Sequence, residues 1–322
     1  MRGRCTTYSG LVSWETRTMR KRFLVVLLAL TVLIIQPLIT YVQGLQFKPL
    51  PPYPPSVADQ AAAESRNWFI VFLNGLTTDC DGSPYRNMGF RSIRRHLVKT
   101  GHYRYYDTRF LMYSYTGGQF RNGRWFPQAY TSDDTFQPIA ASVAHLRELV
   151  QEAAREHPDA GFVLVGHSLG GRIAFDYLDT ADDQELERIR GLVTLDAPLL
   201  GIGHQALTIP VLILELAPAK KQTVVEQLLV SHDQLFARER EVVRTIESLA
   251  LKNIQVITLA SRDDLVVSSR WSVATRPDGR MASDGAVVSA GRSHGTWLRR
   301  TGHVQILNHP TAREALASIL GI

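Results

Sequence analysis

One serine in the chain lies in a pattern that makes a hydroxyl nucleophilic. Ser168 is the third residue of Gly-His-Ser-Leu-Gly-Gly, and the apolar run 162–165 precedes this motif. A G-x-S-x-G motif between a strand and a helix forms a tight turn that lifts the serine above the sheet edge. The N-terminus of the following helix favours negative charge. The pattern predicts that Ser168 attacks an electrophilic carbon, while the backbone N–H of Leu169 stabilises the oxyanion. The alternative is that the motif is a Gly-rich turn between a strand and a helix with no catalytic role.

A serine hydroxyl is a weak nucleophile, so it needs a base that a third group orients. In chain order, an acid and then a histidine are expected after later strands. Asp264 follows the apolar run 254–259, and His303 precedes the last predicted helix. We therefore expect Ser168, His303 and Asp264 to act as nucleophile, base and orienting acid.

Two other aspartates remain alternatives for the orienting acid. Asp263 is one residue closer to the same strand, and a loop can absorb a shift of one residue. Asp196 follows the apolar run 192–195; it could otherwise be a loop or capping carboxylate. Among the other histidines, His309 is expected to cap the last helix, and His167 to pack beside the nucleophile.

The elements that must position these residues alternate along the chain. Apolar or aromatic runs alternate with helical periodicity, which predicts a parallel sheet covered on both faces. The expected strands are 68–73, 110–115, 162–165, 192–195 and 254–259, and the expected helices are 91–98, 138–156, 169–178 and 311–320. The predicted fold class is α/β, in one domain over 66–322.

The motifs and their order resemble the α/β-hydrolases of the lipase/esterase kind. Phe72-Leu73-Asn74-Gly75-Leu76 is similar to the oxyanion segment of that superfamily, in which a histidine usually occupies the place of Asn74. The resemblance implies the backbone N–H of Leu76 as the second oxyanion donor. Some lipases of this kind carry their acid where Asp196 stands. The resemblance implies an α/β-hydrolase fold with a mostly parallel central sheet, helices on both faces and a cap insertion.

The activity that the resemblance implies is hydrolysis of a carboxylic ester through an acyl-enzyme, on an ester or lipid-like substrate. The same three residues would also serve an acyltransferase, a thioesterase or an amidase, because only the pocket distinguishes these reactions. A catalytically silent binding protein of the same fold is a further alternative.

Two irregular regions are expected near the pocket. An insertion at about 202–252 stands where these enzymes often carry a lid, and its stretch 207–217 is strongly apolar. That stretch is either an acyl-binding wall or lid, or an ordinary buried segment. Its later part, 223–251, reads as an amphipathic helix. The long aromatic loop 117–134 could cover the pocket.

The N-terminal part of the chain has the composition of a membrane anchor. Residues 23–42 are uncharged and follow a basic cluster, which is typical of a spanning helix with the N-terminus in the cytoplasm. We expect a leader and single-pass anchor over 1–44, a Pro-rich linker over 45–65, and an extracytoplasmic catalytic domain. A cleaved signal, with secretion, is the alternative, and translation could start at Met1 or Met19.

Charge and cysteine content exclude several other classes of protein. The net charge of +6 comes mostly from the leader, because residues 45–322 contain 30 basic and 29 acidic side chains. Nucleic-acid binding is therefore not expected. With only two cysteines and no HExxH or Walker motif, we expect neither a metal nor another cofactor.

Overall fold

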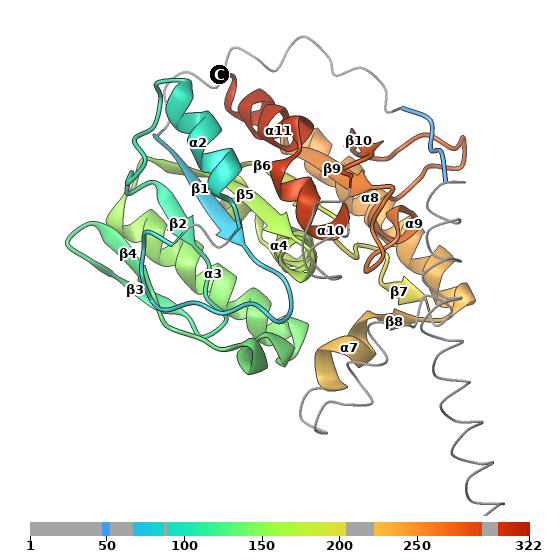
Figure 1. The fold of residues 1–322 in the computed structure, drawn as a ribbon, viewed down its shortest axis with the longest axis horizontal. Coiled ribbons are helices and arrows are strands. Elements are labelled where there is room, and N and C mark those ends of the chain that lie inside the picture. Colours follow the sequence, from blue (N-terminus) through green and yellow to red (C-terminus); the bar gives the residue numbers. More distant parts are fainter. Residues whose placement is uncertain (1–46, 52–66, 87–88, 204–221, 292–301) are drawn as a thin grey trace, which may run out of the picture.

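The computed structural model describes residues 47–51, 67–86, 89–203, 222–291 and 302–322 (Figure 1). The predicted anchor 23–42, most of the linker and the apolar stretch 207–217 lie outside these residues. Within the described ranges, no helix is both long enough and apolar enough to span a membrane.

A six-stranded sheet forms the centre of the molecule. Its strand order is β10-β9-β6-β5-β1-β2, and all neighbouring strands are parallel. The strands are β1 (Asn67–Leu73), β2 (Phe110–Met112), β5 (Ala160–His167), β6 (Ile189–Leu195), β9 (Gln255–Ser261) and β10 (Asp284–Val288). Central parallel strands are buried on both faces, so β1 and β5 are almost continuously apolar. The predicted parallel sheet is confirmed, although β2 ends three residues earlier than expected. The edge strand β10 was missed because it is half-exposed and only weakly apolar.

Helices cover both faces of this sheet. The longer ones are α2 (Arg91–Lys99), α3 (Ile139–Glu156), α4 (Leu169–Thr180), α8 (His232–Leu251) and α11 (Pro310–Leu320). Phe69 of β1 contacts His157, which ends α3, whereas Phe72 contacts Phe90, which precedes α2. Because residues three apart on a strand point to opposite faces, α2 and α3 lie on opposite sides of the sheet. The α4 helix packs with α3, and α11 packs with α2 (Figure 1).

The insertion between β6 and β9 differs from the single amphipathic helix expected over 223–251. It contains the short helix α7 (Gln222–Leu228) and the strand β8 (Leu229–Val230), which pairs in parallel with β7 (Ile202–Gly203). The long helix α8 begins only at His232, where Ser231 caps it. The α8 helix packs against β9 and is thus the crossover helix between two sheet strands.

The aromatic loop contains a β-hairpin, which the sequence reading missed. Strands β3 (Gly118–Arg121) and β4 (Arg124–Pro127) pair antiparallel. Trp125 is buried and its Nε1 donates to the carbonyl of Met112 at 2.9 Å. Phe120 contacts His157 at the end of α3, which precedes β5 and so lies at the amino edge of the sheet. Phe120 therefore packs on the domain body near the amino edge of the sheet, whereas Trp125 packs against the carboxyl end of β2.

The remaining elements are short. They are η2 (Ser132–Phe136), α5 (Asp183–Leu186), α9 (Ser269–Ser272), α10 (Gly302–Gln305) and η6 (Ile306–Asn308). Since the sheet is parallel, the segments that follow β1, β5, β6 and β9 all meet at its carboxyl edge. The predicted site residues lie in these segments and in α10.

Candidate active site

Ser168 occupies a sharp turn between β5 and α4. Its φ is 54° and its ψ is −128°, a conformation that residues with side chains rarely adopt. Such a backbone costs on the order of 1–3 kcal/mol and persists only where the surroundings enforce it. The Ser168 N–H donates to the carbonyl of Leu195 at 2.9 Å, so β6 helps to hold the turn.

Close backbone packing explains the glycines around Ser168. A Cβ on Gly166 would lie 2.4 Å from the Cα of Gly171, and a Cβ on Gly170 would lie 2.4 Å from the carbonyl oxygen of Leu73. No side chain fits at either position, so the motif is required by the packing of α4 against β5 and β1.

His303 and Asp264 form a buried hydrogen-bonded pair. Nδ1 of His303 lies 2.7 Å from Oδ2 of Asp264, and both residues are buried. Oδ1 of Asp264 accepts from the backbone N–H of Val266 at 2.6 Å and of Val267 at 3.0 Å. With its proton on Nδ1, a neutral His303 presents Nε2 as a proton acceptor. This arrangement can act as an oriented general base.

Asp196 is a second acid beside this pair. It follows β6 with a φ of 47° and is completely buried. Oδ1 accepts a hydrogen bond from the N–H of Ser261, and Oδ2 has no hydrogen-bond partner among the described residues. Burial, reinforced by the charge of Asp264, raises the pKa of Asp196 well above its usual range. The structure therefore favours a protonated, neutral Asp196.

The side chains of Asp196, Asp264 and His303 are close enough together that a bound metal ion has to be considered. Asp196, Asp264 and His303 each offer one ligand atom within 4.8 Å of the others. N–H donors already occupy both oxygens of Asp264, and the proton that bonds His303 to Asp264 occupies Nδ1. Only Oδ2 of Asp196 and Nε2 of His303 remain, fewer than the three or four protein ligands of zinc sites. The donor set fits an acid–base cluster better than a metal centre.

His167 supports the backbone of His303. Its Nε2 lies 2.6 Å from the carbonyl oxygen of His303, and because a carbonyl only accepts, Nε2 carries the proton. Burial and the neighbouring His303 lower the pKa of His167 to about 3. A neutral His167, next to Ser168 in the sequence, thus packs against the ring of His303.

The loop after β1 passes directly beside Ser168. The hydroxyl of Tyr115 donates to the carbonyl of Asn74 at 2.8 Å, and the hydroxyl of Thr78 donates to the carbonyl of Gly75 at 2.8 Å. Further along, the N–H of Thr77 donates to Oγ1 of Thr135 at 3.1 Å. These bonds hold the loop in place. No sequence motif predicts that Tyr115 and Thr135 have this role.

Two backbone donors of this region remain available. The N–H groups of Leu76 and Leu169 donate to no acceptor within the described part of the chain. Both belong to the segments that flank Ser168, where an oxyanion hole requires free donors.

The serine and the histidine are not hydrogen-bonded to each other. Oγ of Ser168 faces Gly75, where an added Cβ would lie only 2.9 Å away. Among the described contacts, none joins Oγ to the ring of His303. Hydrogen bonds between a nucleophile and its general base are often long in unliganded structures and tighten only when substrate binds.

The other predicted residues lie apart from the base. Oδ2 of Asp263 accepts from the hydroxyl of Ser289 and from the N–H of Gly291, so it points away from His303. The prediction that His309 caps the last helix is confirmed, since its Nδ1 accepts from the N–H of Thr311 at 3.3 Å.

Comparison with known protein families finds a match over part of the chain. A family model described as serine aminopeptidase, S33, matches residues 134–283, just under half of the chain. The matched range contains Ser168, Asp196 and Asp264 but not His303. A search of the curated proteins found no match.

Several solved structures are similar to the chain at low identity. Phospholipase PlaB from Legionella pneumophila, in complex with thio-NAD, is 12% identical with a TM-score of 0.41, over 61% of this chain and 38% of that one. A lipase-esterase related protein from Clostridium acetobutylicum is 10% identical with a TM-score of 0.43, over 78% and 94% of the two chains. A metagenomic carboxyl esterase is 12% identical with a TM-score of 0.41, over 80% and 77%. The chain spans well under half the length of the phospholipase, and similarities at this level indicate no substrate.

Proposed function

We propose that the chain is a serine hydrolase of the α/β-hydrolase fold that cleaves carboxylic esters through an acyl-enzyme. One observation carries the proposal: Ser168 lies in a strained turn at the same sheet edge as the buried His303–Asp264 pair, whose ring nitrogen Nδ1 and carboxylate oxygen are 2.7 Å apart. If Ser168 had no catalytic role, neither its strained backbone nor the buried His303–Asp264 pair would be needed.

Acylation uses these residues in turn. Oγ of Ser168 attacks the acyl carbonyl while Nε2 of His303 takes the hydroxyl proton, and Asp264 stabilises the imidazolium that forms. The N–H groups of Leu76 and Leu169 bind the oxyanion. When the tetrahedral intermediate collapses, the ester C–O bond breaks and His303 gives its proton to the departing alkoxide.

Deacylation repeats the same proton transfers with water. Nε2 of His303 takes a proton from a water molecule, and the resulting hydroxide attacks the acyl carbon of the ester formed by Ser168. The bond between that carbon and Oγ then breaks, and Oγ recovers the proton from His303. The free carboxylic acid is released.

If an acceptor other than water took the acyl group, or if the leaving group were not an alcohol, the reaction class would change. The three catalytic residues would stay the same. Transfer to an alcohol would make the chain an acyltransferase, and a thiol or amine leaving group would make it a thioesterase or amidase. The amidase alternative has specific support, since the matching family model is described as a serine aminopeptidase. Release of acid to water, compared with transfer to an added alcohol, separates hydrolase from transferase.

The first test uses the full-length chain and p-nitrophenyl esters from acetate to palmitate. We expect Ser168→Ala to lower kcat/KM by at least about 10³-fold, because the nucleophile is lost. The matched control is Ser318→Ala, since Ser318 is exposed on α11. Activity that survives Ser168→Ala, or no reaction of Ser168 with a phosphonate probe, would contradict the proposal.

We further propose that residues 23–42 anchor the protein in a membrane and that the insertion at about 202–252 is a cap. The anchor proposal is supported by 20 uncharged residues that follow Arg20, Lys21 and Arg22. An N-terminal mass measured on native material distinguishes a retained anchor from a cleaved signal. A mature chain that begins near residue 45 would contradict the anchor.

A further inference from the structure

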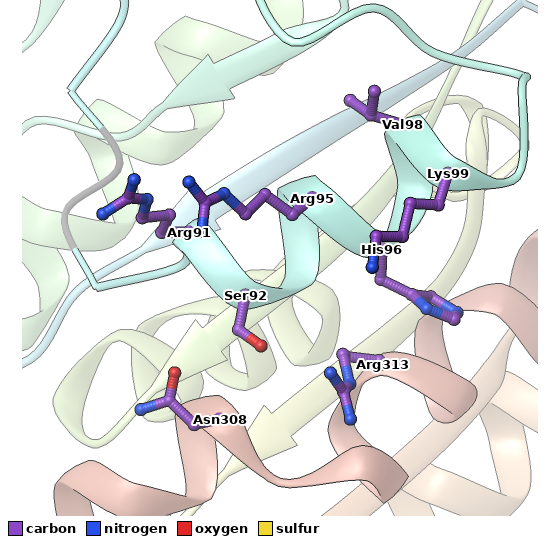
Figure 2. Close-up of a pocket in the computed structure, with 8 residues that line it drawn as sticks. All are labelled: Arg91, Ser92, Arg95, His96, Val98, Lys99, Asn308 and Arg313. Atoms are coloured by element: carbon purple, nitrogen blue, oxygen red, sulfur yellow. The ribbon is translucent and has the colours of Figure 1, made fainter.

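A cationic cavity lies on the outer face of the domain, between α2 and the segment that follows the proposed catalytic histidine. Its volume is 570 Å³, within the usual range of small-ligand pockets. One wall is α2, and the other consists of η6 and α11 (Figure 2). The two walls are more than 200 residues apart in sequence, so only the packing of α2 against α11 creates the cavity.

The charges that line this cavity all have the same sign. Arg91, Arg95 and Lys99 are spaced four residues apart on α2, and Arg313 lines the cavity from α11. No acidic side chain is part of the lining, and none of these four cations forms an ion pair with any residue that the structure describes. Like charges at this helical spacing repel each other, so the arrangement destabilises α2. A bound anion would offset that repulsion.

Uncharged donors complete the lining. Figure 2 shows Ser92 and His96 on the side of α2 that faces Asn308 and Arg313. Hydroxyl, amide and imidazole groups can donate hydrogen bonds to an anion that the guanidinium groups neutralise. The charge is local, since residues 45–322 as a whole contain 30 basic and 29 acidic side chains.

We propose that this cavity binds a phosphate monoester group, held between the cations of α2 and Arg313 of α11. A phosphate monoester carries nearly two negative charges at neutral pH, and its oxygens match the paired donors of guanidinium groups. A single carboxylate offers less charge and fewer oxygens to cations on two walls. The phosphate belongs either to a soluble ester or to the headgroup of an anionic lipid. The inference does not depend on the proposed esterase activity.

The position of the cavity links its occupant to the catalytic segment. Asn308 ends η6, which directly follows the α10 turn that carries His303. An anion bound to both walls would join α2 to this segment.

Two binding measurements on the full-length chain in an uncharged detergent test the proposal. One is calorimetry with glycerol 3-phosphate. The other, after dilution below the critical micelle concentration of the detergent, is flotation with phosphatidylcholine vesicles that contain or lack phosphatidic acid. The cavity variants are Arg91→Gln/Arg95→Gln on one wall and Arg313→Gln on the other. The control is Arg240→Gln/Arg244→Gln, which removes the same charge at the same spacing from exposed positions of α8.

We expect both cavity variants to weaken binding by about tenfold or more, while the control binds like the unaltered chain. Binding of glycerol 3-phosphate identifies a soluble ester as a ligand, and binding to phosphatidic acid vesicles alone identifies a lipid headgroup. Because the N-terminal apolar segment can itself insert into vesicles, only the difference between variants counts. Equal loss in the control, or no binding by the unaltered chain in either measurement, overturns the proposal. Folding of each variant is checked by its Tm, and the Arg313→Gln variant tests the cavity independently of α2.

Discussion

Two aspartates follow neighbouring strands at the same edge of the sheet, and both are buried, yet their surroundings differ. Asp264, after β9, accepts hydrogen bonds from two backbone N–H groups and from His303. Asp196, after β6, accepts one from Ser261 and leaves Oδ2 without a partner among the described residues. Donors stabilise a carboxylate, whereas burial without donors favours the neutral acid. Burial and position after a strand therefore do not distinguish the two candidates for the orienting acid, whereas the number of donors does.

The backbone explains why the two aspartates find different numbers of donors. The loop after Asp264 turns back, so the N–H groups of Val266 and Val267 point at its own carboxylate. Asp196 has a φ of 47° and its N–H is used by the carbonyl of Leu259, which extends the sheet ladder. Within the part of the chain that the structure describes, its side chain accepts only from the N–H of Ser261.

The largest effect is expected from Asp264→Asn. The substitution leaves the shape of the site but removes the charge that stabilises the imidazolium of His303, so kcat/KM should fall by about 10³–10⁴-fold. The measurement is steady-state hydrolysis of the best p-nitrophenyl ester. The control is Asp263→Asn at the adjacent position, which should retain nearly full activity because Asp263 bonds to Ser289. A similar fall in the control would mean that Asp263 is the acid.

A smaller effect is expected in the pH dependence of stability. The raised pKa of Asp196 means that the folded state holds a proton that the unfolded state releases above about pH 4. The contribution of Asp196 to the free energy of unfolding is therefore full below that pH. It is lost as the pH rises towards the raised pKa. The unaltered chain should therefore lose up to about 1.4 kcal/mol per pH unit relative to Asp196→Asn above pH 4.

Urea unfolding of the two proteins at several pH values measures this difference. His167, whose lowered pKa changes stability in the opposite sense, is present in both proteins and cancels in the comparison. Parallel pH profiles would show that Asp196 is ionised in the folded state.

The smallest effect is expected from Asp196→Asn on activity. Asparagine keeps an oxygen for the N–H of Ser261 and is neutral like the protonated acid, so kcat/KM should change by less than about tenfold. The same ester assay measures it. If this variant loses more activity than Asp264→Asn, the two aspartates have the opposite roles.

Local sequence predicted most of the fold and pointed to Ser168 as the candidate nucleophile. Buried parallel strands are continuous apolar runs, and a tight strand-to-helix turn tolerates only small residues beside the serine, so both leave local patterns. The same patterns did not reveal the edge strand β10, the β3–β4 hairpin or the break in the helix expected over 223–251. Each of these is short or half-exposed, and its pairing depends on distant partners.

Only the tertiary structure decided how the site works around Ser168. The sequence allowed Asp196, Asp263 or Asp264 as the acid, because all three follow apolar strands. Their difference lies in which donors the folded chain brings to each carboxylate, and those donors come partly from other segments. The close approach of Gly75 to Ser168 is likewise a contact between separate segments. Local patterns record burial and backbone shape, whereas ionisation and contacts between segments depend on three-dimensional packing.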